Sequence, residues 1–181
     1  MRPLHVLVGG PPASGKSTLA PALARELGLP LLAKDTVKEA LVDVLGADDV
    51  DASRRLGRAA VEVLFALARE AGSAVVESVW HRSYAPAQVA RLPGDVVEVF
   101  CRAPLEVLTA RYRERAGTRH GGHFDAVRTP EELFGPETCE PLAGPWPLVE
   151  VDTSRPVEVV ALARLVRDLP LGTAGRFTSG C

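Results

Sequence analysis

A short apolar run that ends directly in a glycine- and proline-rich turn is the feature that most constrains this chain. In the stretch LHVLVGGPPASGKSTLA, residues 4–20, the first five residues have the composition of a buried parallel strand. From Lys16 onward, apolar side chains recur at helical spacing, and Gly28 ends that run as the expected helix C-cap. The residues between this strand and this helix suit neither element, which indicates a turn that holds a ligand.

The turn GPPASGKS, residues 10–17, matches the phosphate-binding pattern G-x-x-x-x-G-K-[S/T] between a strand and a helix. In such a loop, glycines let backbone N–H groups turn inward around phosphate oxygens, and the next helix adds its unpaired N–H groups. We expect Lys16 to reach the β- and γ-phosphates and the Ser17 hydroxyl to ligate Mg²⁺. A glycine-rich turn with a solvent-facing lysine is the alternative. The predicted nucleotide-binding residues of this segment are Gly10, Ala13, Ser14, Gly15, Lys16, Ser17 and Thr18.

Composition and cysteine usage argue against several classes of protein. The 181 residues suffice for one domain, and the formal net charge of −2 gives no overall attraction to nucleic acid. Three widely spaced cysteines without a Cys-x-x-Cys pair argue against a disulfide framework or a zinc site. No apolar run approaches the roughly 20 residues of a membrane span, and the N-terminal apolar segment is too short for a signal peptide. We therefore expect a cytoplasmic protein without a membrane partner.

Apolar strands alternate with amphipathic helices along the rest of the chain. The predicted strands cover residues 29–34, 73–79, 95–101 and 147–152, and the predicted helices cover residues 35–46, 52–71, 84–92, 104–117 and 155–169. This alternation predicts an α/β domain with a parallel sheet and helices on both faces. We place the domain at residues 1–170 and expect residues 171–181 to form a flexible tail, since they have little to bury.

Four segments together resemble the small P-loop kinases: GGPPASGKSTLA, KDTVKEAL, RYRERAGTRHGGHFD and VEVDTS. This group includes the AAA-domain kinases, the gluconate and shikimate kinases, the chloramphenicol phosphotransferases and the kinase domain of phage polynucleotide kinase. The resemblance covers about residues 4–169, and the phosphate-binding loop is its most specific part. It implies a P-loop NTPase three-layer sandwich with a five-stranded parallel sheet of order 2-3-1-4-5. It also implies an arginine-rich lid at about residues 111–128 and ATP as the phosphoryl donor.

In these kinases an aspartate directly after the second strand accepts the proton of the attacking hydroxyl, and the resemblance gives this role to Asp35. Its position agrees, because the carboxyl ends of parallel strands meet at one edge of the sheet, where ligands bind. Phosphoryl transfer needs an oriented nucleophile, which a carboxylate holds by hydrogen bonding. The alternative role of Asp35, as N-cap of the next helix, is compatible with catalysis. Lys38 either contacts the acceptor or a phosphate, or is an exposed helical lysine.

Glu77 closes the apolar run of the third predicted strand, and the implied strand order places it beside the phosphate-binding loop. An unpaired carboxylate is costly to bury at such a place, so we expect it to bind Mg²⁺ or the acceptor hydroxyl. Trp80, His81 and Arg82 follow directly, and they either line the acceptor pocket or form a partly buried loop. The predicted acceptor-binding residues are Asp35, Lys38, Glu77, Trp80 and Arg82.

The segment after the fourth predicted strand is rich in arginine. Arg111 and Arg115 lie four residues apart and share one face of the predicted helix. By the resemblance, Arg115 and Arg119 are lid residues that neutralise charge on the transferring phosphoryl group, and Arg111 lies nearer the base. Arginine suits this task because its planar fork binds phosphate bidentately; a solvated basic helix face is the alternative. Asp152 and Thr153 either border the nucleotide or cap the following helix.

The leading hypothesis is an ATP- and Mg²⁺-dependent kinase acting on a hydroxyl of a small molecule, such as a nucleoside, a sugar or an antibiotic. A polynucleotide 5′-hydroxyl kinase would need a basic groove with stacking aromatics, and the chain has only two Trp, two Tyr and five Phe. A nucleoside monophosphate kinase would need further cations, for which Arg54, Arg55 and Arg58 are candidates. A nucleotide-dependent regulatory module is the non-enzymatic alternative, and the arginine-rich lid favours phosphoryl transfer over it.

Overall fold

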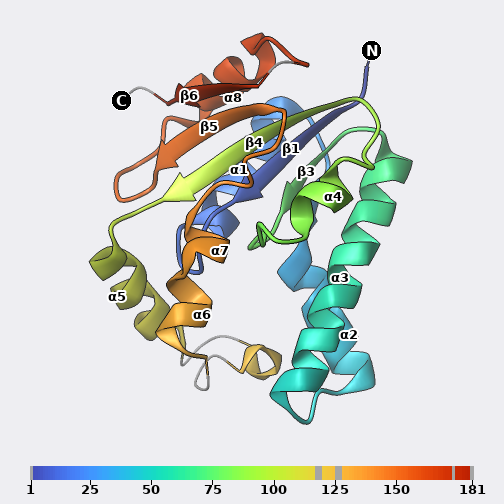
Figure 1. The fold of residues 1–181 in the computed structure, drawn as a ribbon, viewed down its shortest axis with the longest axis vertical. Helices are drawn as coiled ribbons and strands as arrows, with labels where there is room; N and C mark the ends of the chain where they lie inside the picture. The colour runs from blue at the N-terminus through green and yellow to red at the C-terminus, as the bar shows by residue number, and fades with distance from the viewer. Residues whose placement is uncertain (1, 117–119, 125–127, 173, 180–181) are drawn as a thin grey trace.

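Six parallel strands form one sheet in the order β2-β3-β1-β4-β5-β6 (Figure 1). The computed structural model describes residues 2–116, 120–124, 128–172 and 174–179. The strands are β1 (Leu4–Gly9), β2 (Leu31–Ala33), β3 (Ala74–Glu77), β4 (Asp95–Arg102), β5 (Pro147–Asp152) and β6 (Gly175–Thr178). The order of the first five confirms the prediction. Strand β1 lies between β3 and β4, with Val6 opposite Val75 on one side and Val97 on the other.

The sixth strand differs from the sequence-based expectation. Residues Gly175–Thr178 pair in parallel with β5, and the Arg176 guanidinium donates to Glu150 Oε1 at 2.9 Å. Phe177 packs against the hydrophobic core. The segment thus satisfies backbone groups along the edge of β5 and buries an aromatic side chain, so the prediction of a flexible tail was wrong for these residues.

Helices connect the strands, and the short elements between residues 121 and 139 were not predicted. They are α1 (Lys16–Leu27), α2 (Lys34–Leu45), α3 (Val50–Ala71), α4 (Ala85–Val89), α5 (Leu105–Ala116), the 3₁₀ turn η1 (Gly121–His123), α6 (Pro130–Phe134), α7 (Pro136–Cys139) and α8 (Val159–Asp168). Helix α8 begins four residues later than the predicted 155. Within the described residues, no helix combines the length and the apolar character needed to cross a membrane.

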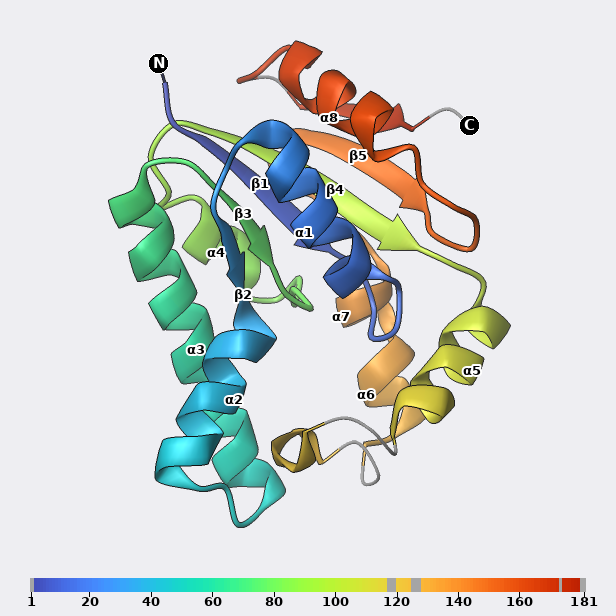
Figure 2. The same cartoon turned by 180° about the vertical axis from the view of Figure 1, so that it is seen from behind.

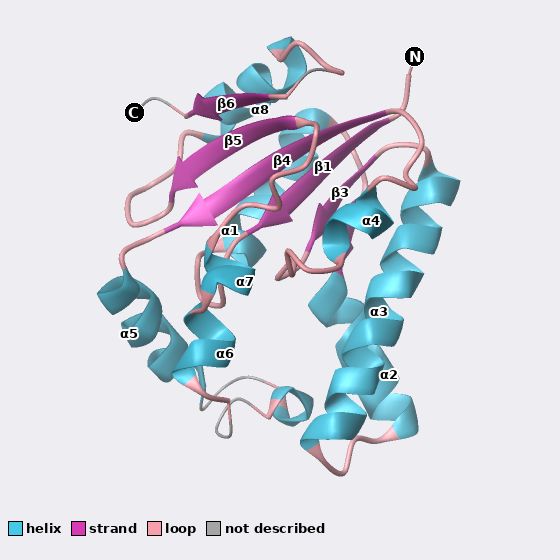
Figure 3. Cartoon of the chain, in the orientation of Figure 1, coloured by secondary structure: helices cyan, strands magenta, loops and turns pink. Residues whose placement is uncertain are grey.

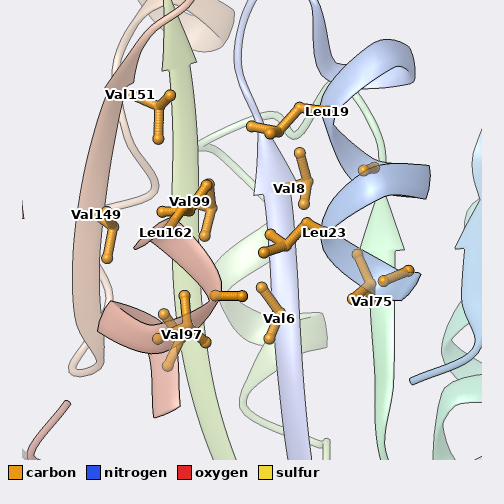
Figure 4. Close-up of a cluster of buried hydrophobic side chains, with 14 of the residues drawn as sticks. Val6, Val8, Leu19, Leu23, Val75, Val97, Val99, Val149, Val151 and Leu162 are labelled. Carbon is orange, nitrogen blue, oxygen red and sulfur yellow. The ribbon is translucent and has the colours of Figure 1, made fainter. Parts of the chain in front are cut away.

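The helices cover both faces of the sheet, because side chains of each strand alternate between them. On one face, Val6, Val8, Val97 and Val99 pack against α1 and α8, which Figure 2 shows in front of the sheet and Figure 4 shows in detail. On the other face, residues such as Leu7 pack against α3 and α4 (Figure 3). The result is the expected three-layer sandwich.

Helices α2 and α3 pack side by side and extend beyond the carboxyl edge of the sheet (Figures 1 and 2). Asp49 caps α3, since its Oδ1 accepts from the Ala52 N–H at 2.6 Å. Helix α2 begins one residue earlier than predicted, and Ala33 occupies its N-cap position. Asp35 therefore lies in the first turn of α2, and its prediction as the N-cap was wrong.

Candidate active site

The loop between β1 and α1 has the backbone of a phosphate cradle. Gly10 has φ +133°, Ala13 has φ +63° and Gly15 has φ +83°. A Cβ atom at Gly10 would lie 2.3 Å from the Cys101 carbonyl oxygen, so only glycine fits there without moving β4. Left-handed residues among right-handed neighbours turn consecutive N–H groups toward one concave side, which is the arrangement that binds an anion.

Lys16 lies within this cradle and is 6% exposed. Its Nζ donates to the Pro11 carbonyl at 2.8 Å. Burial lowers the pKa of Lys16, while the charges of Glu77, Cys101 and Asp35 oppose that shift and Arg115 adds to it. The ammonium group is therefore close to both predicted carboxylates and to the predicted lid arginine.

The loop after β5 holds the cradle in place through Thr153. The Thr153 hydroxyl lies 2.8 Å from the Ser14 carbonyl and 3.0 Å from the Arg102 carbonyl, and Arg111 donates to the Thr153 carbonyl at 3.0 Å. Helix α8 begins only at Val159, so neither Asp152 nor Thr153 caps that helix. Thr153 thus links the loop, the end of β4 and α5.

A cavity of about 540 Å³ adjoins the cradle on the α8 side. We call it the nucleotide cavity. Five predicted nucleotide-binding residues of the loop line it, together with Arg111 and Thr153: Ala13, Gly15, Lys16, Ser17 and Thr18. Further lining comes from Arg155, Pro156, Val157 and Val159. Gly10 and Ser14 are buried and do not line it. Asp152 also lies outside: it is exposed and accepts hydrogen bonds from the Ser154 N–H and hydroxyl, which lower its pKa.

A second cavity of about 350 Å³ lies on the other side of the cradle, and we call it the acceptor cavity. Asp35, Lys38 and Glu77 line it, as predicted, whereas Trp80 and Arg82 do not. The cradle and lid residues that line both cavities are Lys16, Ser17 and Arg115. The two cavities therefore meet at these three side chains.

The two carboxylates predicted for this site lie at the carboxyl ends of the neighbouring strands β2 and β3. Glu77 ends β3 and is 5% exposed, and Asp35 is the second residue of α2, which begins directly after β2. Lys34 Nζ lies 3.0 Å from Asp35 Oδ1. Within the described residues, no three His, Cys, Asp or Glu side chains are grouped as metal ligands. The hard oxygen donors near the cradle, Ser17 and Glu77, fit Mg²⁺, which in phosphoryl-transfer sites uses few protein ligands together with phosphates and water.

Trp80 belongs to the hydrophobic core. It is 4% exposed, its ring lies 5.7 Å from that of Phe65, and it covers Gly9, where a Cβ atom would lie 2.9 Å from Trp80 Cδ1. Arg82 points elsewhere, forming an ion pair with Glu140. Arg119 lies outside the described residues.

Several residues of the acceptor cavity were not predicted, because they come from separate segments. Ser53 of α3 accepts from the buried Lys38 ammonium at 2.7 Å. His81 and Tyr84 stack with ring centroids 5.3 Å apart and both line the cavity. Further lining comes from Tyr112, His123, Arg128, Glu132, Leu133 and Thr138. His81 differs from the rest of this group, because the sequence analysis named it among three residues that either line the acceptor pocket or form a partly buried loop, and it does line the cavity.

The part of the predicted lid around η1 rests on α2 and α3. His123 Nε2 lies 2.8 Å from Glu39 Oε1, and His120 Nε2 lies 2.9 Å from Asp43 Oδ1. The Ser53 hydroxyl donates to the Gly122 carbonyl at 2.6 Å. Through these contacts, η1 is held beside α2 and α3, and its residue His123 lines the acceptor cavity.

Comparison with known proteins decides the family, because the AAA domain model matches residues 5–134. The chain belongs to this family of P-loop kinases. A candidate kinase from Chloroflexus aurantiacus J-10-fl has a TM-score of 0.82 and 34% identity, covering 92% of this chain and 98% of that one. A gluconokinase structure from Sinorhizobium meliloti 1021 has a TM-score of 0.58 and 24% identity over 92% of this chain and 95% of its own, which shows the shared fold.

Two kinds of sequence relative agree with this assignment. The cytidylate kinase of Ignicoccus hospitalis is 30% identical over 138 residues, which are 71% of this chain and 74% of that protein. An uncharacterized protein of Mycobacterium tuberculosis is 31% identical over 136 residues, which are 67% of this chain. The match spans only 26% of the length of that mycobacterial protein.

Proposed function

We propose that this P-loop kinase transfers the γ-phosphoryl group of ATP to a hydroxyl of a small molecule, with Asp35 holding the hydroxyl. The observation that carries the proposal is the pair of cavities that share Lys16, Ser17 and Arg115, while Asp35 and Glu77 line only the acceptor cavity. A two-substrate transfer enzyme needs such a junction, since donor and acceptor must meet in line.

The residues divide the work of the reaction. Asp35 accepts the hydroxyl proton as the new oxygen–phosphorus bond forms and the bond from the γ-phosphorus to ADP breaks. Lys16 and Arg115 neutralise the charge that spreads over the transferring group, and the burial of Lys16 strengthens its attraction. Ser17 and Glu77 would hold Mg²⁺, which when bound neutralises charge on the β- and γ-phosphates. Arg111, Thr153 and the residues 155–159 bind the rest of the nucleotide.

The experiment is an ATP-depletion screen over nucleosides, sugars, sugar acids and aminocyclitol or chloramphenicol-type antibiotics, with Mg²⁺ present and absent. With an acceptor found, we expect Asp35→Asn to lower kcat by about 10²–10⁴-fold, the usual contribution of a positioned base. Asp48→Asn, an exposed aspartate in the loop before α3, serves as the matched control. Lys16→Ala should abolish binding of a non-hydrolysable ATP analogue in calorimetry. Full turnover by Asp35→Asn would refute the role of that residue.

A nucleoside monophosphate kinase is the second candidate. Two of the three arginines that such an enzyme could use, Arg54 and Arg58, line the acceptor cavity, whereas Arg55 does not. The likeness to a cytidylate kinase points the same way. Product analysis by phosphorus NMR separates the two candidates, because a phosphate acceptor yields a phosphoanhydride and a hydroxyl acceptor yields a phosphate ester.

A further inference from the structure

The acceptor cavity is strongly cationic although the chain carries a net charge of −2. Among the residues that the structure describes, the carboxylates that line it are Asp35, Glu77 and Glu132. The cations that line it are Lys16, Lys34, Lys38, Arg54, Arg58, Arg115 and Arg128. Lys16 and Arg115 border the nucleotide cavity as well and serve the transferring phosphate. Without these two, the remaining cations still outnumber the described carboxylates. A neutral acceptor would not require this excess of positive charge.

The stacked pair His81 and Tyr84 lines the cavity together with Lys34, Arg58 and Arg128. Burial lowers the pKa of His81, with the charge of Glu137 opposing the shift and those of Lys34 and Arg128 adding to it. Burial raises the pKa of Tyr84, and the charge of Arg58 opposes that shift. Lys34, Arg58 and Arg128 belong to α2, α3 and the segment before α6, so three separate parts of the chain bring positive charge to the cavity that His81 and Tyr84 line.

The ion pairs within the protein do not use all of this charge. Arg54 pairs with Glu132 at 2.6 Å, and Lys34 pairs with Asp35. Arg128 reaches Glu132 only at 3.9 Å. Arg58 makes no hydrogen bond or ion pair with any residue that the structure describes. The Arg58 guanidinium is thus available to a ligand in this cavity, and the Arg128 guanidinium is held only by its long ion pair with Glu132.

We propose that the acceptor carries an oxyanion, a carboxylate or a phosphate, in addition to its reactive hydroxyl, and that Arg58 and Arg128 bind this group beside His81 and Tyr84. The inference rests on the proposed function, since it concerns the acceptor of that same transfer. Arginine suits the task because its planar fork binds carboxylate and phosphate bidentately. An acceptor anchored by these two arginines presents its hydroxyl to Asp35 and Lys16, which line the same cavity.

The test is calorimetric binding of three matched probes, glucose, D-gluconate and glucose 6-phosphate, to protein saturated with Mg²⁺ and a non-hydrolysable ATP analogue. Saturation keeps the probes out of the phosphate-binding loop. We expect at least one charged probe to bind about tenfold or more tightly than glucose, as expected for a charge-assisted contact. The preferred probe identifies the anion as carboxylate or phosphate.

Arg58→Ala should weaken the preferred probe about tenfold or more, and Arg58→Lys should restore part of the loss, because it keeps the charge but not the fork. Arg55→Ala, an exposed neighbour on α3 outside the cavity, is the matched control and should change nothing. None of the three variants should alter affinity for the ATP analogue. Equal affinity for all three probes, no binding by any of them, or an Arg58→Ala variant that binds normally would each overturn the inference. Failure of the analogue to bind would instead contradict the proposed function.

Discussion

Replacing Thr153 by valine tests the link between the phosphate-binding loop and the last strands of the sheet. Valine has nearly the shape of threonine, so the change removes the hydroxyl and little else. Thr153 is 8% exposed, and its hydroxyl is the only hydrogen-bond partner of the Ser14 carbonyl among the described residues. The Arg102 carbonyl keeps a second partner, the Thr153 N–H at 2.9 Å. One buried carbonyl therefore loses its hydrogen bond.

A buried polar group left without a partner costs about 1–3 kcal/mol, and with a single carbonyl affected we expect the free energy of unfolding to fall by about 1–2 kcal/mol. For a chain of this length, that loss corresponds to a decrease in Tm of about 2–8 °C. Urea denaturation followed by circular dichroism measures the change, and Thr153→Ser, which keeps the hydroxyl, is the control. A valine variant as stable as the original chain, or a serine variant that loses as much, would refute the reasoning.

Two further predictions concern the lid segment and the core. A Cβ atom at Gly122 would lie 2.7 Å from Val42 Cγ1, so we expect Gly122→Ala to displace η1 from α2 and raise the KM for the acceptor several-fold. The added change Val42→Ala should restore KM, and a double variant no better than the single one would contradict this packing argument. Burial lowers the pKa of His5 below 6.5, so the unfolded chain binds a proton first and stability falls as the pH drops below 6.5. This dependence amounts to at most about 1.4 kcal/mol of unfolding free energy per pH unit, between 6.5 and the lowered pKa, and His5→Leu should remove it. Urea denaturation between pH 5 and 8 measures the free energy of unfolding of both proteins. The same slope against pH in both would contradict the prediction.

The residues predicted best are those that lie close together in the chain. The phosphate-binding loop depends on contiguous residues, and its cradle geometry follows from glycines whose spacing is visible without any tertiary contact. The strand order of the first five strands followed from the family resemblance, and the structure confirms it. Asp35 and Glu77 share the acceptor cavity because parallel strands present their carboxyl ends at the same edge.

The direction in which a loop side chain points could not be predicted from the local sequence pattern. Four residues after Glu77 the chain turns His81 into the cavity, while Trp80 is buried against Phe65 and Arg82 pairs with Glu140. No periodicity exists in such a loop to separate the three neighbours. The same reason explains why Tyr84, Arg58 and Arg128 were not recognised as parts of one cavity.

By itself, the sequence determined the α/β alternation, the nucleotide-binding turn and the carboxylates at the sheet edge. These features depend on spacing within one or two elements, where the backbone period dictates which side chains share a face. Only the tertiary structure decided that β6 completes the sheet, that Thr153 secures Ser14, and that Arg58 and Arg128 face one cavity. Such contacts join segments far apart in the chain, and their energies come from burial and charge in the assembled fold, which no local pattern records.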